Sequence, residues 1–168
     1  MLVNNAGINA GEANQTVEER MKSGHLTVVS LDEVRRVFET NVFGVIAVTQ
    51  AMLPLLRESP AARVVNLSST SGSLTLNSNP AESRRATFGT YSISKVALNA
   101  VTVAFAADLQ LAGIMVNSAD PGLTATDLND FLGSRTVKQG AHEPVRLTLL
   151  DADGPTGSFS NDAGPAPW

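Results

Sequence analysis

The sequence predicts an α/β protein with a parallel sheet, and three observations support this class. Three short apolar runs, "MLVNN" (residues 1–5), "RVVNL" (63–67) and "GIMVNS" (113–118), have the length and composition of buried strands. Long segments with helical spacing separate them, so the connections are crossovers and the strands pair in parallel. The 168 residues leave room for one core, and we therefore expect a single domain over residues 1–168.

The first long helix is expected over residues 30–57. Ser30 and Glu33 have the spacing of a capping box at its start. Asn41 interrupts the apolar stripe of this helix, either as a core amide bonded to backbone or as a functional group. The stripe itself follows the helical repeat and consists of Val34, Phe38, Val45, Val48 and Met52.

The second long helix is expected from about residue 90 to residue 111, and it carries two stripes. One stripe should cover the sheet, and it comprises Tyr91, Lys95, Leu98, Thr102, Phe105 and Leu109. The other is made of small side chains, Ala97, Ala100, Ala104 and Ala107. Such a face allows another helix to approach closely, and a second subunit is our hypothesis for that helix.

The remaining segments are assigned from composition. "EPVRLTLL" (143–150) predicts a further helix and "TGSFS" (156–160) a fourth strand. Segments 8–29 and 70–90 are rich in Gly, Ser, Thr and Asn and are expected to be loops, and the tail "NDAGPAPW" is turn-like.

The composition of the chain disfavours several classes of binding partner. A net charge of −4 and a pI near 5.1 argue against nucleic acid or an anionic membrane surface. The chain has no cysteine, its uninterrupted apolar stretches fall short of the roughly 20 residues that span a bilayer, and its start lacks a signal-peptide pattern. His25 and His142 have no metal-ligand spacing around them, so we expect no metal. We expect a cytoplasmic protein acting on a small molecule.

Polar residues follow each predicted strand, in "NNAG" (4–7), "SST" (68–70) and "DPGLTAT" (120–126), and these should meet at one edge of the sheet. In "YSISK" (91–95), Tyr91 and Lys95 lie one helical turn apart. A nearby cation favours the phenolate and lowers the pKa of a tyrosine, which makes Tyr91 a candidate general acid. This spacing alone occurs by chance on many helices, whereas Ser69 after the second strand and Asn41 add to it.

Taken together, these motifs resemble the short-chain dehydrogenase/reductase family. "NNAG", "TNVFG" (40–44), "VVNLSS" (64–69), "YSISK" and "VNSADPGLTATDL" (116–128) occur in the order of that family. The segment "KQGAHEPVRLTLLDADGPTGSF" is similar to the carbonyl-reductase-like branch. The resemblance implies part of a doubly wound, Rossmann-like sheet and an NAD(P)-dependent oxidoreductase that reduces a ketone or aldehyde or oxidises a secondary alcohol.

The resemblance also implies roles for individual residues. Tyr91 would donate the proton to the carbonyl, Lys95 would lower its pKa and bind the nicotinamide ribose, Ser69 would bond the substrate oxygen, and Asn41 would hold a water that relays protons. NADP(H) or NAD(H) would be contacted by Tyr91, Lys95 and residues after the strands, namely Asn5, Ala6, Gly7, Pro121, Gly122, Thr124 and Thr126. Residues 127–140 would form a mobile substrate lid, while the carboxylates in 127–130 are expected to be solvated.

The sequence departs from the family pattern in two places. The glycine-rich dinucleotide turn and its strand, which precede "NNAG" in the family, are absent; Gly7 and Gly11 do not replace them, because Ala13 stands at the third glycine position. The alternative function is therefore a truncated, weak or inactive module that folds and forms homo-oligomers through helices 30–57 and 90–111.

The longer interval between Ser69 and Tyr91 predicts an inserted loop, residues 74–89, near the substrate mouth. A sugar epimerase or dehydratase is disfavoured because those chains usually carry a larger C-terminal domain.

Overall fold

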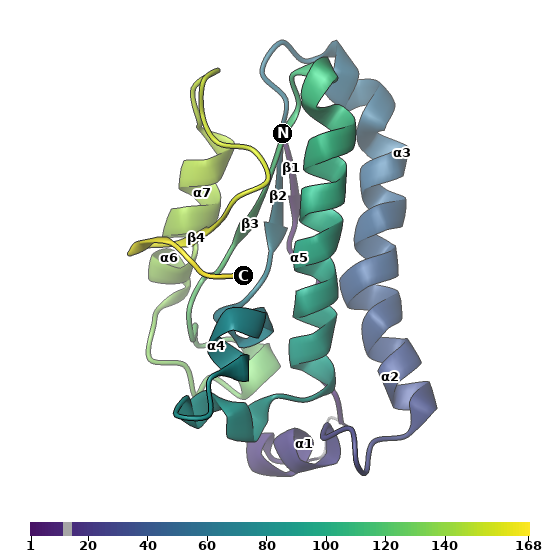
Figure 1. Cartoon of the computed structure of the whole chain (residues 1–168), viewed down its shortest axis with the longest axis vertical. Coiled ribbons are helices and arrows are strands. Elements are labelled where there is room, and N and C mark those ends of the chain that lie inside the picture. The colour runs from purple at the N-terminus through teal and green to yellow at the C-terminus, as the bar shows by residue number, and fades with distance from the viewer. Residues whose placement is uncertain (12–14) are drawn as a thin grey trace.

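The centre of the fold is one twisted sheet flanked by helices (Figure 1). A computed structural model describes residues 1–11 and 15–168, with the backbone alone for Val17, Met21 and Arg84. The strands lie in the order β1-β2-β3-β4-β5, with the first four parallel and the last pair antiparallel. Their bounds are β1 (Leu2–Asn4), β2 (Arg63–Leu67), β3 (Met115–Ala119), β4 (Phe159–Asn161) and β5 (Gly164–Pro165). The predicted α/β class is confirmed.

The first three strands end at nearly the same level, which brings their following loops together. Asn4 pairs with Asn66 in β2, and Asn66 pairs with Ser118 in β3. The residues that come after these positions therefore emerge at one edge of the sheet, as parallel pairing requires.

Helices cover the two faces of the sheet (Figure 1). One face is covered by α2 (Leu31–Phe38), the π-helical turn η1 (Glu39–Phe43) and α3 (Gly44–Glu58), which form one continuous rod, and by α5 (Thr90–Leu109). The other face is covered by α7 (His142–Thr148), which comes after α6 (Val137–Gly140). Apolar side chains fill both layers: Leu56, Val64, Leu109, Ile114 and Val116 on the first, and Val65, Ala119 and Leu147 on the second.

The first long helix differs from its predicted pattern in two ways. The π-helical turn at Asn41 adds a residue to one turn and rotates the buried face of α3 relative to that of α2. Val48, expected in the core, is therefore 47% exposed, whereas Thr49 is fully buried. The capping box is only half formed: the Ser30 hydroxyl accepts from Glu33 N, but the Glu33 carboxylate accepts from Gly11 N at 2.6 Å.

The second long helix is close to its predicted form. Lys95, Leu98, Thr102 and Leu109 of the expected inner stripe are buried, and Phe105 packs partly buried on the core. Ala100, Ala104 and Ala107 of the alanine stripe are exposed. The helix continues into the turn η4 (Gln110–Ala112) and ends at Gly113, whose φ of 67° suits a residue without a side chain.

The two predicted loops contain short helices, so that prediction is wrong in detail. Segment 8–29 holds α1 (Val17–Ser23), which begins with a complete capping box between Thr16 and Glu19. Segment 70–90 holds η2 (Thr70–Gly72), α4 (Leu74–Ser78) and η3 (Ser83–Thr87). Ala13, which argued against a phosphate loop, lies outside the described residues.

The C-terminal elements occur near their predicted positions. The predicted helix 143–150 is α7, and the predicted strand 156–160 is β4, which lies three residues further along the chain at its start. The tail returns through β5, and the Trp168 ring stacks on Phe159 with centroids 5.4 Å apart. The backbone oxygen of Trp168 accepts from Thr75 N and from the Ser73 hydroxyl, which ties the tail to α4.

Two helical stretches, Leu31–Glu58 and Thr90–Ala112, are long and apolar enough to cross a membrane by length and composition alone. The sequence predicts no stretch long enough to span a bilayer when only uninterrupted apolar residues are counted. The helices of the structure are longer, because they continue through the polar residues that interrupt those apolar stretches. Both stretches pack on the sheet, and core helices of this kind meet the same criteria.

Candidate active site

The site lies where the strands end and α5 begins. Thr90 donates to the Gly24 carbonyl through both its backbone N and its hydroxyl, each at 2.8 Å, which anchors the start of α5. Tyr91 is in the first turn of this helix, one turn before Lys95. Of the predicted pair, Lys95 reaches a strand end, because its amine bonds the last residue of β2.

Lys95 is buried and points to the end of β2. Its Nζ donates to the Leu67 carbonyl at 2.7 Å and lies 5.5 Å from the centroid of the Tyr91 ring. Only 4% of the residue is exposed, and this burial lowers the pKa of Lys95 to about 8. The absence of a side chain at Gly72 permits this packing, because a Cβ there would lie 2.7 Å from the Lys95 Cβ.

The pKa of Tyr91 moves in the opposite direction from the predicted one. Burial raises the pKa of the phenol above its ordinary value, and the negative charge of Asp120 raises it further. The expectation of a net lowering of this pKa is thus wrong for this structure, because burial and Asp120 dominate the shift. The sequence placed only the lysine beside the tyrosine, whereas the fold adds desolvation and a carboxylate at the end of β3.

Asn41 connects the π-helical turn to the loop after β1 and to α5. Its Oδ1 accepts from Ile8 N at 2.8 Å, and its Nδ2 donates to the Ile8 carbonyl and to the Ser94 hydroxyl. Ser94 in turn donates to the Tyr91 carbonyl at 2.6 Å. An amide oxygen has two lone pairs, so Oδ1 keeps one for a further donor such as water.

Ser69 lies two residues beyond β2, and its hydroxyl accepts hydrogen bonds without donating its own hydrogen in them. The Ser69 Oγ accepts from the backbone N and from the hydroxyl of Ser71, at 3.1 and 2.9 Å. Because both contacts use Ser69 as the acceptor, its own O–H remains available to donate to a ligand oxygen.

The loop after β1 leaves space beside Lys95 and Asn41. A Cβ built on Gly7 would lie 3.5 Å from Lys95 Nζ and 3.6 Å from Asn41 Oδ1, so the missing side chain keeps this position open to both polar atoms. Asn5 and Ala6 are exposed on the same loop. The arrangement fits the polar ribose and nicotinamide end of a dinucleotide, which needs close backbone approach and hydrogen-bond donors.

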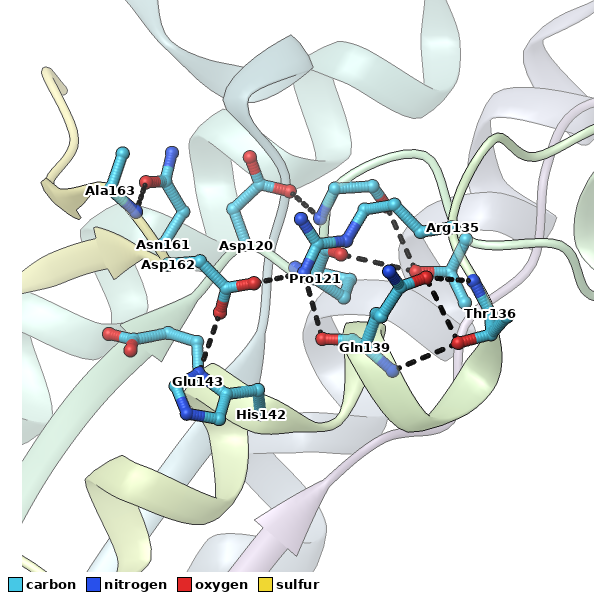
Figure 2. A network of polar contacts seen from close by, with 12 residues as sticks. Asp120, Pro121, Arg135, Thr136, Gln139, His142, Glu143, Asn161, Asp162 and Ala163 are labelled. Carbon is cyan, nitrogen blue, oxygen red and sulfur yellow. Dashed lines mark hydrogen bonds and ion pairs between the residues drawn. The ribbon is translucent and has the colours of Figure 1, made fainter.

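The loop after β3 carries the other residues predicted to contact the cofactor, and part of the polar network that holds it is drawn in Figure 2. Asp120 accepts from Gly122 N at 2.9 Å, and Thr124 donates to the Pro121 carbonyl at 3.1 Å. Thr126 N donates to Asn129 at the start of η5 (Asp127–Asn129). These bonds shape the loop that carries Pro121, Gly122, Thr124 and Thr126.

Arg135 links the expected lid to the C-terminal hairpin (Figure 2). Its guanidinium pairs with Asp162 and donates to the Gln139 carbonyl at 2.8 Å, and its backbone bonds Leu123 and Ala125. The Asp162 carboxylate also contacts His142 Nδ1 at 3.1 Å. Arg135, then His142, lowers the pKa of Asp162.

One expectation about charged residues is corrected here, and one contact was not predicted. Asp130 is not simply solvated, because it pairs with the largely buried Arg20 of α1 at 2.6 Å. His142 is exposed but bonded to Asp162, which sequence spacing did not indicate. Within residues 1–11 and 15–168, no group of three or more His, Asp or Glu side chains has an arrangement that could hold a metal.

Sequence reasoning also missed residues that bear on the site. The motif after the third predicted strand contains Asp120 but does not predict that it lies near Tyr91, and the predicted site assigns no role to Ser94 inside "YSISK". The signal for Ser94 was available, because it lies three residues after Tyr91 on the same helix face.

A family model described as short chain dehydrogenase matches residues 1–136. Among curated proteins, the chain is 34% identical over 152 residues to the short-chain dehydrogenase anuI of Penicillium roqueforti, covering 87% of this chain and 55% of that protein. It is 29% identical to salutaridine reductase of Papaver bracteatum, covering 95% of this chain and 67% of that protein. It is 30% identical to (+)-neomenthol dehydrogenase of Capsicum annuum, covering 82% of this chain and 54% of that protein.

Solved structures give the same match. The carbonyl reductase Sniffer of D. melanogaster superposes with a TM-score of 0.78 at 27% identity, and an NADPH-bound carbonyl reductase from chicken fatty liver with 0.75 at 27%. Each comparison covers 99% of this chain and 65% of the other. The chain thus spans between 54% and 67% of the length of these relatives and structures.

Proposed function

Because the chain belongs to the short-chain dehydrogenase/reductase family, we propose that it is an NAD(P)-dependent oxidoreductase that reduces a ketone or aldehyde, or oxidises a secondary alcohol. The observation that carries the proposal is the position of Lys95. Its buried amine lies beside the Tyr91 ring, at the end of β2 and next to the open position at Gly7. Reductases among the relatives and carbonyl reductases among the similar structures support the reaction class.

Tyr91 is the proton donor in this proposal. A phenol with a raised pKa keeps its proton at neutral pH but is a weaker acid, and it can donate because the alkoxide that forms from a carbonyl oxygen is more basic still. Ser69 donates its free O–H to the same oxygen and stabilises the developing charge. A bound nicotinamide cofactor would supply the hydride that the carbonyl carbon accepts.

Lys95 and Asn41 restore the proton on Tyr91. With a pKa of about 8, Lys95 is mostly protonated near neutral pH, and its positive charge stabilises the phenolate after proton donation. Asn41 Oδ1 and Lys95 Nζ border the same open position at Gly7, and a water bonded to the free lone pair of Oδ1 would carry a proton from solvent to Lys95.

The cofactor is NADP(H) or NAD(H). We assign Lys95 and Tyr91 to the nicotinamide ribose, and the loop residues Asn5, Ala6, Gly7, Pro121, Gly122, Thr124 and Thr126 to the same end of the dinucleotide. An NADPH-bound carbonyl reductase among the similar structures supports this class of cofactor. Titration of NADPH and of NADH into the protein, followed by nucleotide fluorescence, distinguishes the two.

The reaction is tested by ketone-dependent oxidation of the reduced nucleotide. We expect Ser69→Ala to slow the reaction about 100-fold, the cost of removing one donor to a developing oxyanion. Ser59→Ala is the matched control, because Ser59 lies between α3 and the start of β2, at the opposite end of that strand from Ser69, and its hydroxyl accepts from Ala61 N at 3.4 Å. Equal rates for wild type and Ser69→Ala would refute the role of Ser69.

A second candidate function is a homo-oligomer-forming module with little turnover, and the exposed face of α5 favours it. That face is apolar and is covered by small side chains, namely Ala100, Val103, Ala104 and Ala107. Two larger apolar side chains, Val48 and Leu55, are exposed on α3. Sedimentation of the protein tests self-association, and nucleotide titration separates an idle module from an enzyme. We also propose a cytoplasmic location, with which a chain that has no cysteine is compatible.

A further inference from the structure

A row of buried polar side chains crosses the sheet beneath α3 and α5. Asn4, Asn66 and Ser118 lie side by side on β1, β2 and β3. Asn4 Nδ2 donates to Asn66 Oδ1 at 2.8 Å and to the Thr49 hydroxyl of α3 at 3.1 Å. Asn66 Nδ2 donates to the Thr102 hydroxyl of α5 at 2.9 Å. None of the five residues is more than 8% exposed.

Thr102 is where this row meets α5. Besides accepting from Asn66, its Oγ1 donates to the Leu98 carbonyl at 3.0 Å and lies 2.8 Å from the Ser118 hydroxyl. A hydroxyl has one proton, so Ser118 donates to Thr102. The single polar residue on the sheet-facing stripe beyond Lys95 is thus bonded to two neighbouring strands at once.

The same helix makes a second polar attachment to β2 near its start. Lys95 Nζ bonds the Leu67 carbonyl, and Leu67 directly follows Asn66 in the strand. Two turns of helix separate Lys95 from Thr102. Between them, Asn99 Oδ1 accepts from the hydroxyl of Ser68, the residue after β2, at 2.6 Å. Polar contacts therefore fix α5 to β2 and the residue after it at three heights along the helix, and Thr102 makes the one furthest from Tyr91.

From this arrangement we propose that Thr102 is a positioning residue that sets the register of α5 on the sheet, and thereby the placement of Tyr91 and Lys95 against Ser69. Hydrogen bonds are directional, whereas apolar contacts on either side of Thr102 permit small shifts along the helix axis. A displacement of about 1 Å at reacting groups is enough to lower a rate about 100-fold. The proposal rests on the proposed function for its kinetic consequence but not for its structural one.

The test uses the fact that Tyr91 is the only tyrosine in the chain. A protein labelled with ¹³C at the tyrosine Cζ alone gives one signal from that label, which reports the surroundings of the Tyr91 hydroxyl directly. We expect Thr102→Val, which keeps the shape but removes the hydroxyl, to move this signal and to lower kcat for ketone reduction by about 10- to 100-fold with little change in KM. Thr102→Ser keeps the hydroxyl and should return both values close to those of wild type.

Thr49→Val is the matched control. It makes the same chemical change at a fully buried threonine of the same row, but on α3. We expect it to lower stability without moving the Tyr91 signal. If Thr102→Val does not fold, Ser118→Ala removes one of the three contacts of Thr102 and should move the signal by a smaller amount.

A Tyr91 signal that stays in place in Thr102→Val, or in Ser118→Ala where that variant is needed, would overturn the proposal. So would an equal movement in Thr49→Val, since a general loosening of the core would then explain the effect. If wild type reduces no ketone, the proposed function fails, and the NMR measurement still decides the role of Thr102.

Discussion

Burial of the Lys95 ammonium should reduce the stability of the fold at neutral pH, and Lys95→Met should reveal by how much. The folded pKa of about 8 lies below the ordinary value of 10.5. Each pH unit between the two corresponds to about 1.4 kcal/mol, so burying the charged amine costs about 3 kcal/mol. The folded state binds this proton less tightly than the unfolded chain, and stability therefore rises with pH between about 8 and 10.5.

Lys95→Met removes this pH dependence, because methionine does not titrate. We expect the difference in unfolding free energy between wild type and variant to change by about 2 to 3 kcal/mol in favour of wild type from about pH 7 to about pH 10. Urea unfolding followed by Trp168 fluorescence, at several pH values, measures it. Lys138→Met, at an exposed lysine, is the matched control and should show no such change. A difference that stays constant with pH would refute the reasoning.

Three further predictions concern charges around the site. Asp120→Asn should lower the pKa of Tyr91, measured as the pH at which the phenolate absorbance of the single tyrosine appears; an unchanged titration would exclude Asp120 as a cause. Glu143→Gln should cost about 2 kcal/mol in chemical unfolding, because the buried Glu143 carboxylate accepts two charge-assisted bonds from Arg146; a loss below experimental error would contradict this. Asp162→Asn should speed hydrogen exchange of the backbone around Arg135, because the ion pair with Asp162 is lost. Wild type should show the same faster exchange as pH falls below the ordinary aspartate pKa of about 4, because Asp162 stabilises this region only when it is ionised. Equal protection from exchange at low and neutral pH would argue against the pairing.

The parallel sheet and the long helix α5 could be predicted because local patterns carried them. Three apolar runs predicted strands β1, β2 and β3, and the spacing from Tyr91 to Leu109 predicted the inner face of α5. The π-helical turn could not be read from the helical repeat, and it displaced Val48 from the core in favour of Thr49. Helix α1 was detectable from the capping box at Thr16, but its few residues made composition a poor guide.

The candidate site was predictable in its members and less so in its electrostatics. Motif spacing selected Ser69, Tyr91 and Lys95, and parallel topology brought the strand ends together. The direction of the Tyr91 pKa shift depends on burial and on Asp120, which is 29 positions away in the sequence and contributes only through tertiary structure. The ion pair between Arg20 and Asp130 likewise joins residues that are far apart in the sequence, so no local pattern predicts it.

The proton-donor role of Tyr91 is tested most directly by the rate of ketone reduction in Tyr91→Phe. The variant keeps the aromatic ring beside Lys95 and removes only the phenolic oxygen. Loss of a positioned general acid predicts a rate at least about 100-fold lower, measured at saturating nucleotide because the Tyr91 hydroxyl is also assigned to the ribose. A variant that turns over a ketone as fast as the wild-type chain would contradict the account.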